Sequence, residues 1–158
     1  MIIEYSEKYK QEVINLLIEL QQHLADIDVE GYNILTENYG EQYFEKVLNE
    51  VILFQGKMFL YNHNDKILGL VAGVINNDAE TTLGFCAPKR GRVTELIVSK
   101  NARGRGIGEK LLSHVENHLY SVGCKDVLLS LFAYNESAKG FYEKMGYHAR
   151  LITMIKSK

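Results

Sequence analysis

The sequence predicts an α/β or α+β fold with a mixed β-sheet. Two strand-like runs, Lys57–Tyr61 and Lys66–Ile75, are joined by a short segment of turn-forming residues, which is typical of an antiparallel hairpin. Further along, Val93–Val98 reads as a strand, and a helical segment and a second strand-like run, Val127–Phe132, follow it. This is the order of a strand–helix–strand crossover. The length and the absence of a repeat or linker indicate one domain over residues 1–158.

The N-terminal third predicts an edge strand and two helices. Met1–Tyr5 is a short apolar-rich opening that we expect to form the strand. Apolar residues then recur every three or four positions, which predicts a helix over Glu7–Ala25. Glu30–Tyr39 is mixed in character and is expected to be a loop. A second amphipathic helix is expected around Tyr43–Val51.

The C-terminal half contains a long connection before the crossover. Asn76–Gly91 holds polar residues, glycines and the one proline, and long connections in compact domains are often functional. After the crossover, a short helix is expected over Ser137–Met145, with Gly146 as its C-terminal cap. Tyr147–Ile155 is expected to be the last strand.

Charge is distributed unevenly, although the formal net charge is only -2. Acidic residues dominate up to Gln55, and basic residues gather around a glycine-rich segment further on. The asymmetry indicates partners of opposite sign, with ordinary solvated helix faces as the alternative. No segment resembles a signal peptide or a membrane span, so we expect a cytoplasmic protein. Cys86 and Cys124 are too few for a disulfide framework and are interpreted as buried or idle thiols.

The most informative segment is Glu95–Leu112, ELIVSKNARGRGIGEKLL, in which a strand enters a basic, glycine-rich loop that opens a helix. A helix N-terminus has unpaired N–H groups and a partial positive charge, so it attracts anions. Glycines let a phosphate approach the backbone, and Arg103 and Arg105 add charged donors. The spacing matches neither G-x-G-x-x-G nor the P-loop pattern G-x-x-x-x-G-K-S/T. A pyrophosphate site is therefore expected, and a helix start without a ligand is the alternative.

Two motifs carry a resemblance to a known family. Arg103-Gly104-Arg105-Gly106-Ile107-Gly108 matches the pattern Q/R-x-x-G-x-G/A, and the segment from Asn135 through Tyr142 to Tyr147 matches N-x-x-A-x-x-x-Y-x-x-x-G-F/Y. The sequence thereby resembles the GNAT superfamily of N-acetyltransferases from about Lys57 to the end. One departure is Lys100, where the family often has proline. The resemblance implies a mixed, mostly antiparallel sheet of about six to seven strands flanked by about four helices.

The resemblance also implies acetyl-CoA as the co-substrate and places residues on it. A splay beside the fourth strand would let the pantetheine arm pair with the backbone of Leu96, Ile97 and Val98, and the N–H of Ile97 or Val98 would polarise the acetyl carbonyl. The coenzyme phosphates would lie on the glycine turn, which comprises Arg103, Gly104, Arg105, Gly106, Ile107 and Gly108. Asn135 would contact the coenzyme as well as cap a helix.

Two side chains are candidates for proton transfer. Tyr142, by its place in the second motif, would lie near the coenzyme sulfur and donate a proton to the leaving thiolate; a packing tyrosine is the alternative. Glu95 shares a strand face with Ile97, and a buried carboxylate there is costly unless it is used or paired. It is the candidate general base, with a salt bridge to Arg92 as the alternative. The histidines carry no motif, and no cluster predicts a metal site.

Three function classes are weighed. The first is transfer of an acetyl group from acetyl-CoA to a primary amine of a small molecule or peptide, by direct attack in a ternary complex. The second is a non-catalytic sensor that binds acyl-CoA, which retention of Tyr142 and Asn135 disfavours. The third is a nucleic-acid-binding domain, which the acidic N-terminal part disfavours. That acidity, at Glu19, Asp26, Asp28 and Glu30, predicts a cationic acceptor. The oligomeric state is open, although small domains of this type often pair.

Overall fold

The computed structural model describes residues 1–76, 84 and 86–156, so part of the expected connection Asn76–Gly91 lies outside the described residues. The elements in chain order are β1 (Ile2–Glu4), the 3-10 helix η1 (Glu7–Tyr9), α1 (Lys10–Ile27), α2 (Tyr39–Leu53), β2 (Lys57–His63), β3 (Lys66–Asn76), β4 (Arg90–Val98), the 3-10 helix η2 (Lys100–Ala102), α3 (Ile107–Ser121), β5 (Asp126–Leu128) and α4 (Glu136–Lys144).

The strands form one mixed sheet in the order β1-β2-β3-β4-β5. The first three pairings are antiparallel, and β5 runs parallel to β4 because α3 carries the chain back across the sheet. The mixed, mostly antiparallel architecture is confirmed, with four α-helices in the described part of the chain. The expected strand number is wrong, since the described residues form a sheet of five strands.

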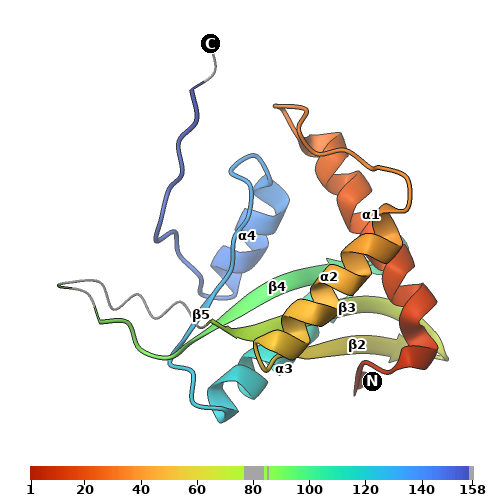
Figure 1. Ribbon diagram of the computed structural model, residues 1–158, viewed down its shortest axis with the longest axis horizontal. Coiled ribbons are helices and arrows are strands. Elements are labelled where there is room, and N and C mark those ends of the chain that lie inside the picture. The colour runs from red at the N-terminus through yellow and green to blue at the C-terminus, as the bar shows by residue number, and fades with distance from the viewer. Residues whose placement is uncertain (77–83, 85, 157–158) are drawn as a thin grey trace.

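The missing strand is the expected Tyr147–Ile155. Gly146 caps α4 in the left-handed region, with its N–H bonded to the Glu143 carbonyl, as the sequence predicts. Beyond the cap the described chain has no regular secondary structure and runs away from the sheet (Figure 1). Leu151 and Met154 are almost fully exposed. The expected strand over Tyr147–Ile155 is therefore wrong, since a strand needs a sheet edge to pair with and the described part of this segment has none beside it.

Helices cover both faces of the sheet (Figure 1). One core cluster joins α1 and α2 to β2 and β3, with Leu17, Phe44 and Leu60 fully buried. The other lies under α3, around Leu111 and Val115. The apolar stripes that predicted the helices are the faces buried in these clusters, which is why periodicity located them.

A β-bulge in β4 determines what each face of this strand presents. Ala72 of β3 pairs with Glu95 and Gly73 pairs with Val93, so Thr94 is an extra residue. Val93 consequently packs in the cluster under α3, whereas Glu95 and Ile97 face α1 and α2. Without the extra residue, period-two alternation would put all three side chains on one face. The expectation that Glu95 shares its face with Ile97 is confirmed.

The close approach of the turn after α2 to the sheet generates a stability prediction. A Cβ on Gly56 would lie well inside van der Waals distance of the Gly73 carbonyl oxygen, and backbone yields little. We expect Gly56→Ala to lower the free energy of unfolding by about 1–3 kcal/mol, as measured by urea denaturation. The control Gly140→Ala, in α4 with nothing within 4 Å of its Cβ, should be neutral or stabilising. Equal stability of Gly56→Ala and wild type would contradict this packing.

Candidate active site

The site begins where β4 and β5 separate. Their parallel pairing covers only the start of β4, from Arg90 with Asp126 to Arg92 with Leu128. From Val93 onward, none of the described strands pairs with this side of β4. The expected strand Val127–Phe132 is therefore cut short at Leu128, because its later residues no longer have β4 beside them. The exposed backbone of β4 is what an extended ligand needs in order to hydrogen-bond as a strand would.

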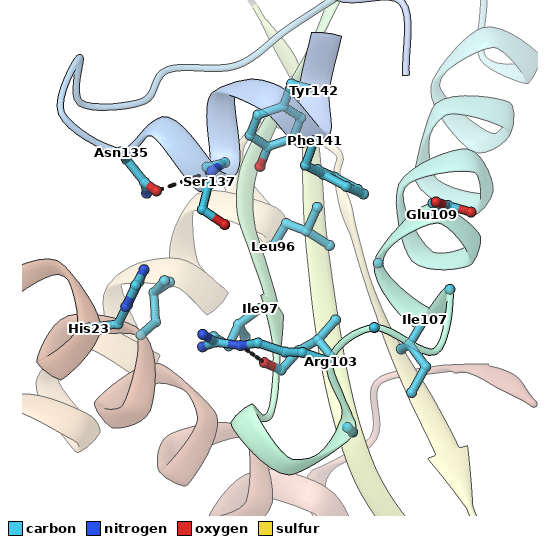
Figure 2. Close-up of a pocket in the computed structure, with 17 residues that line it drawn as sticks. His23, Leu96, Ile97, Arg103, Ile107, Glu109, Asn135, Ser137, Phe141 and Tyr142 are labelled. Carbon is cyan, nitrogen blue, oxygen red and sulfur yellow. Dashed lines mark hydrogen bonds between the residues drawn. The ribbon is translucent and has the colours of Figure 1, made fainter. Parts of the chain in front are cut away.

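A cavity of about 390 Å³ opens beside this unpaired stretch, between α1, β4, the start of α3 and α4 (Figure 2). All of the expected site residues except Glu95 and Arg105 line it. The lining residues are Leu20, His23, Leu96, Ile97, Val98, Ala102, Arg103, Gly104, Gly106, Ile107, Gly108, Glu109, Asn135, Ser137, Ala138, Phe141 and Tyr142. The volume and the mixed apolar and polar lining are those of a small-molecule site.

The glycine turn has the shape of an anion cradle. Gly104 and Gly106 adopt φ angles of 75° and 70°, which residues with a Cβ rarely adopt. A Cβ on Gly104 would meet nothing within 4 Å, so the backbone is open to an approaching group. Gly106 is the N-cap of the 15-residue helix α3, and no side chain caps its first turn. The unpaired N–H groups of that turn and the helix dipole fit a pyrophosphate.

The two arginines of the turn have different surroundings. Arg103 lines the cavity, donates from Nε to the Val98 carbonyl at 3.0 Å and lies 3.8 Å from Glu19 of α1 (Figure 2). Arg105 is exposed and donates to the Asn101 carbonyl at 3.1 Å, outside the cavity lining. Glu19 also accepts from the Lys100 N–H, which holds α1 against the loop. The role of Arg105 in coenzyme binding stays a prediction, and Arg103 is the better placed of the two.

The second motif closes the opposite wall of the cavity. Asn135 is the N-cap of α4, with Oδ1 accepting from the Ala138 N–H at 3.2 Å, which confirms its capping role. Tyr142 is half-buried, and Figure 2 shows its hydroxyl oxygen turned toward the cavity. Burial and the nearby Glu95 carboxylate raise the pKa of Tyr142 to about 12. The phenol therefore remains protonated at neutral pH and can act as a donor.

Glu95 lies just before the cavity-lining stretch of β4, on the face that packs against α2. The residue is 7% exposed, and among the described residues no other charged residue is buried to this extent. Its Oε1 accepts from the Tyr43 hydroxyl at 2.8 Å. Burial raises the pKa of Glu95 to about 7, and the Tyr43 hydrogen bond opposes this rise. Arg92, the alternative partner, is instead paired with Glu50 of α2.

Sequence reasoning did not identify Tyr43, Tyr39 or His23. Tyr43 reads as one apolar position of an amphipathic helix, yet its hydroxyl reaches across the core to Glu95. Tyr39 stacks on it at 5.1 Å, and His23 lines the cavity from α1. A tyrosine on the buried stripe of a helix, in a chain with a carboxylate inside a strand, is the signal that could have suggested the pair.

One of the acidic residues expected at an acceptor entrance, Asp28, is hydrogen-bonded within the loop that follows α1. Asp28 accepts from the backbone N–H groups of Glu30, Tyr32 and Asn33. Although burial raises the pKa of Asp28, the hydrogen bonds from Asn33, Glu30 and Tyr134 outweigh it and hold the pKa well below its usual range. Asn33 also donates to the Tyr134 hydroxyl, which places this loop against the segment before α4.

Comparison with known proteins identifies the family. A sequence model of the Acetyltransferase (GNAT) family matches residues 19–147, and the chain belongs to this family.

Among the described residues, no group of three His, Cys, Asp or Glu side chains is arranged to hold a metal ion. None of the described helices has the length and apolarity to cross a membrane.

Solved structures share the fold at low identity. A variant of the BH1408 protein of Bacillus halodurans matches with a TM-score of 0.79 and 18% identity, over 100% of this chain and 99% of that one. The aminoglycoside 6'-N-acetyltransferase of Acinetobacter haemolyticus gives 0.74 and 12%, over 100% and 97%. Glucosamine-6-phosphate N-acetyltransferase of Arabidopsis thaliana gives 0.64 and 24%, over 99% and 97%. These two enzymes act on different amines, so the shared fold does not select an acceptor.

The contrast between the two arginines generates a binding prediction. We expect Arg103→Ala to weaken acetyl-CoA binding about 10- to 100-fold, since a charged hydrogen-bond donor to an anion is lost. Gly106→Ala should also weaken binding, because alanine is strained at a φ of 70° and would reshape the cradle. Arg105→Ala is the matched comparison and should lose less. Calorimetric titration measures all three, and unchanged affinity in both Arg103→Ala and Gly106→Ala would remove the phosphate assignment.

Proposed function

We propose that this protein transfers an acetyl group from acetyl-CoA to a primary amine of a small molecule or peptide, by direct attack in a ternary complex. The observation that carries the proposal is one continuous cavity joining the open turn at the N-terminus of α3 to the unpaired backbone of β4. The alternative is a non-catalytic sensor of acyl-CoA. The phenol of Tyr142, which faces the cavity, and the buried carboxylate of Glu95 in β4 favour an enzyme.

Binding and polarisation are assigned to backbone groups. Acetyl-CoA supplies an acetyl group activated as a thioester. The first turn of α3 would hold the phosphates, and the free side of β4 would fix the arm along Leu96–Val98. The N–H of Val98 would donate to the carbonyl oxygen as negative charge develops there, because the Ser99 N–H bonds to Leu68 of β3 and N–H groups alternate between the two edges of a strand. Such a donor typically contributes about 100- to 1,000-fold to the rate.

Proton transfer is assigned to Glu95 and Tyr142. The attacking amine must be neutral, and a carboxylate with a pKa of about 7 can accept its proton near neutral pH. Glu95 does not line the cavity. The proton would therefore pass to it either directly, from an amine that reaches the α2-facing side of β4, or through a water molecule. Tyr142 would donate its proton to the departing thiolate. One proton is gained at Glu95 and one is lost at Tyr142, and exchange with solvent restores both.

The decisive experiment follows free thiol when the protein is mixed with acetyl-CoA and a panel of polyamines, aminoglycosides, amino acids and peptide N-termini. Acceptor-dependent thiol release is expected of the enzyme. Binding of acetyl-CoA without release across the panel would indicate the sensor instead.

Removal of the Tyr142 hydroxyl should separate chemistry from binding. We expect Tyr142→Phe to bind acetyl-CoA as wild type does and to lose about 100-fold in turnover, since general acids contribute at least this much. Tyr120→Phe, which deletes an exposed hydroxyl on α3, is the control. Turnover is compared under conditions where chemistry limits the rate. Wild-type turnover in Tyr142→Phe would show that this side chain only packs.

A cationic acceptor is proposed from the acidic residues at the end of α1 and in the loop that follows it, which lies against the wall that carries Asn135. Because Asp28 holds the loop, the test neutralises Asp26 and Glu30 and leaves Asp28 in place. Asp26→Asn with Glu30→Gln should raise KM several-fold for a polyamine at low salt, where attraction is least screened, and spare KM for acetyl-CoA. The control, Glu12→Gln with Asp65→Asn, makes the same charge change elsewhere. An unchanged acceptor KM, or a preference for an anionic amino acid, would refute the charge argument.

A further inference from the structure

We infer that Tyr43 of α2 is a positioning residue that orients the Glu95 carboxylate and keeps it in its charged, proton-accepting form. The inference rests on the proposed role of Glu95 as the general base. It adds a residue that no motif marks and that lies 52 positions away in the chain.

The geometry joins the two side chains across the core. The β4 bulge turns Glu95 toward α2, where its Oε1 accepts from the Tyr43 hydroxyl at 2.8 Å. At 7% exposure the carboxylate gains little from solvent, so this bond is a main source of its stabilisation. Within the described chain no other hydrogen bond to this carboxylate occurs. Oε2 therefore remains able to accept from a water or an amine.

Tyr43 is itself held in place. Its ring stacks on that of Tyr39, with centroids 5.1 Å apart and planes 17° from parallel. Lys46 Nζ lies 5.4 Å from the centroid of the same ring. Tyr39 in turn donates to Gln21 Oε1 of α1 at 3.1 Å. The Tyr43 ring is thus held by two neighbours on its own helix, one of which is tied to α1, as expected of a group that orients a partner.

The charges around Glu95 leave the phenol as its direct partner. Lys46 and Arg92 act on Glu95 only through space and lower its pKa, while Glu50 raises it. Arg92 is hydrogen-bonded to Glu50. The charge of Glu95 also raises the pKa values of Tyr39 and Tyr142, so both phenols lie close enough to interact with it. Burial and the Glu95 charge raise the pKa of Tyr43, so its hydroxyl stays protonated and donates throughout the neutral range.

The sign of the effect follows. The Tyr43 hydrogen bond favours the carboxylate and lowers the pKa of Glu95, opposing the burial that raises it to about 7. Without the hydroxyl the pKa rises further, and a higher pH is needed to form the base. A residue that only fills space would change stability and leave this titration where it is.

The test is the pH dependence of kcat/KM for an amine acceptor found in the thiol-release panel, at saturating acetyl-CoA. Wild type should gain activity as pH rises through about 7, the pKa of Glu95. Tyr43→Phe should move this limb upward by about one to two pH units, given the strength of a hydrogen bond to a charged group. Activity below the limb then falls about 10- to 100-fold and recovers toward wild type above it. Affinity for acetyl-CoA should be unchanged.

Tyr5→Phe is the matched control. It deletes another tyrosine hydroxyl that donates to a glutamate, Glu7, at 2.9 Å, from a ring that packs on Phe44 of the same helix α2. Its pH profile should coincide with that of wild type. Tyr43→Met, which fills the space with a flexible apolar chain, replaces Tyr43→Phe if the latter does not fold, with the same expected shift.

Glu95→Gln distinguishes the two levels of the argument. If it retains the wild-type limb, Glu95 is not the base, and the proposed mechanism fails together with this inference. If Glu95→Gln abolishes the limb but Tyr43→Phe leaves it at the wild-type pH, the base assignment stands and the role of Tyr43 is refuted.

Discussion

The separation of β5 from β4 is the constraint on which the site depends. In a sheet, each interior strand forms backbone hydrogen bonds with a neighbour on both sides. On its β5 side, β4 has such a neighbour only as far as Arg92. The unpaired edge is exposed to a cavity, so N–H and carbonyl groups that point to this edge and not to β3 can bond to a ligand. Helix α4, which follows β5, forms the far wall of the same opening. A defect in pairing thereby becomes the binding surface.

The bulge at Thr94 complements this separation. It lets one strand serve the core under α3 through Val93 and the site through Glu95 and Ile97. The neighbouring charges are arranged to leave Glu95 unpaired with a cation. Arg92 is paired with Glu50, and Arg103 lies near Glu19. A carboxylate whose partner is a neutral phenol keeps a pKa near neutrality, whereas a bidentate arginine would have lowered it and weakened it as a base.

What the sequence predicts and what it misses divide along physical lines. The spacing of apolar residues predicts α1 and α3, and the run of glycines predicts the turn at Gly104 and Gly106, because both signals are local in the sequence. Asn135 was identified as a cap from its own preference. The Tyr43–Glu95 bond and the different surroundings of Arg103 and Arg105 depend on packing between distant segments, which local patterns do not encode. The strand expected over Tyr147–Ile155 is absent because pairing depends on a neighbouring strand, and no edge of the described sheet pairs with this segment.

The burial of Glu95 has a thermodynamic consequence for the whole fold. In the unfolded chain this carboxyl ionises near its ordinary pKa of 4.5, and in the folded protein it ionises at about 7. Between these values the folded state binds more protons, so stability falls as pH rises through this window and remains lower above it. The Tyr43 hydrogen bond reduces that loss by stabilising the folded carboxylate. The same contact therefore limits the cost of burying the charge and makes that charge available to accept a proton, which ties the stability of the β4–α2 interface to the proposed chemistry.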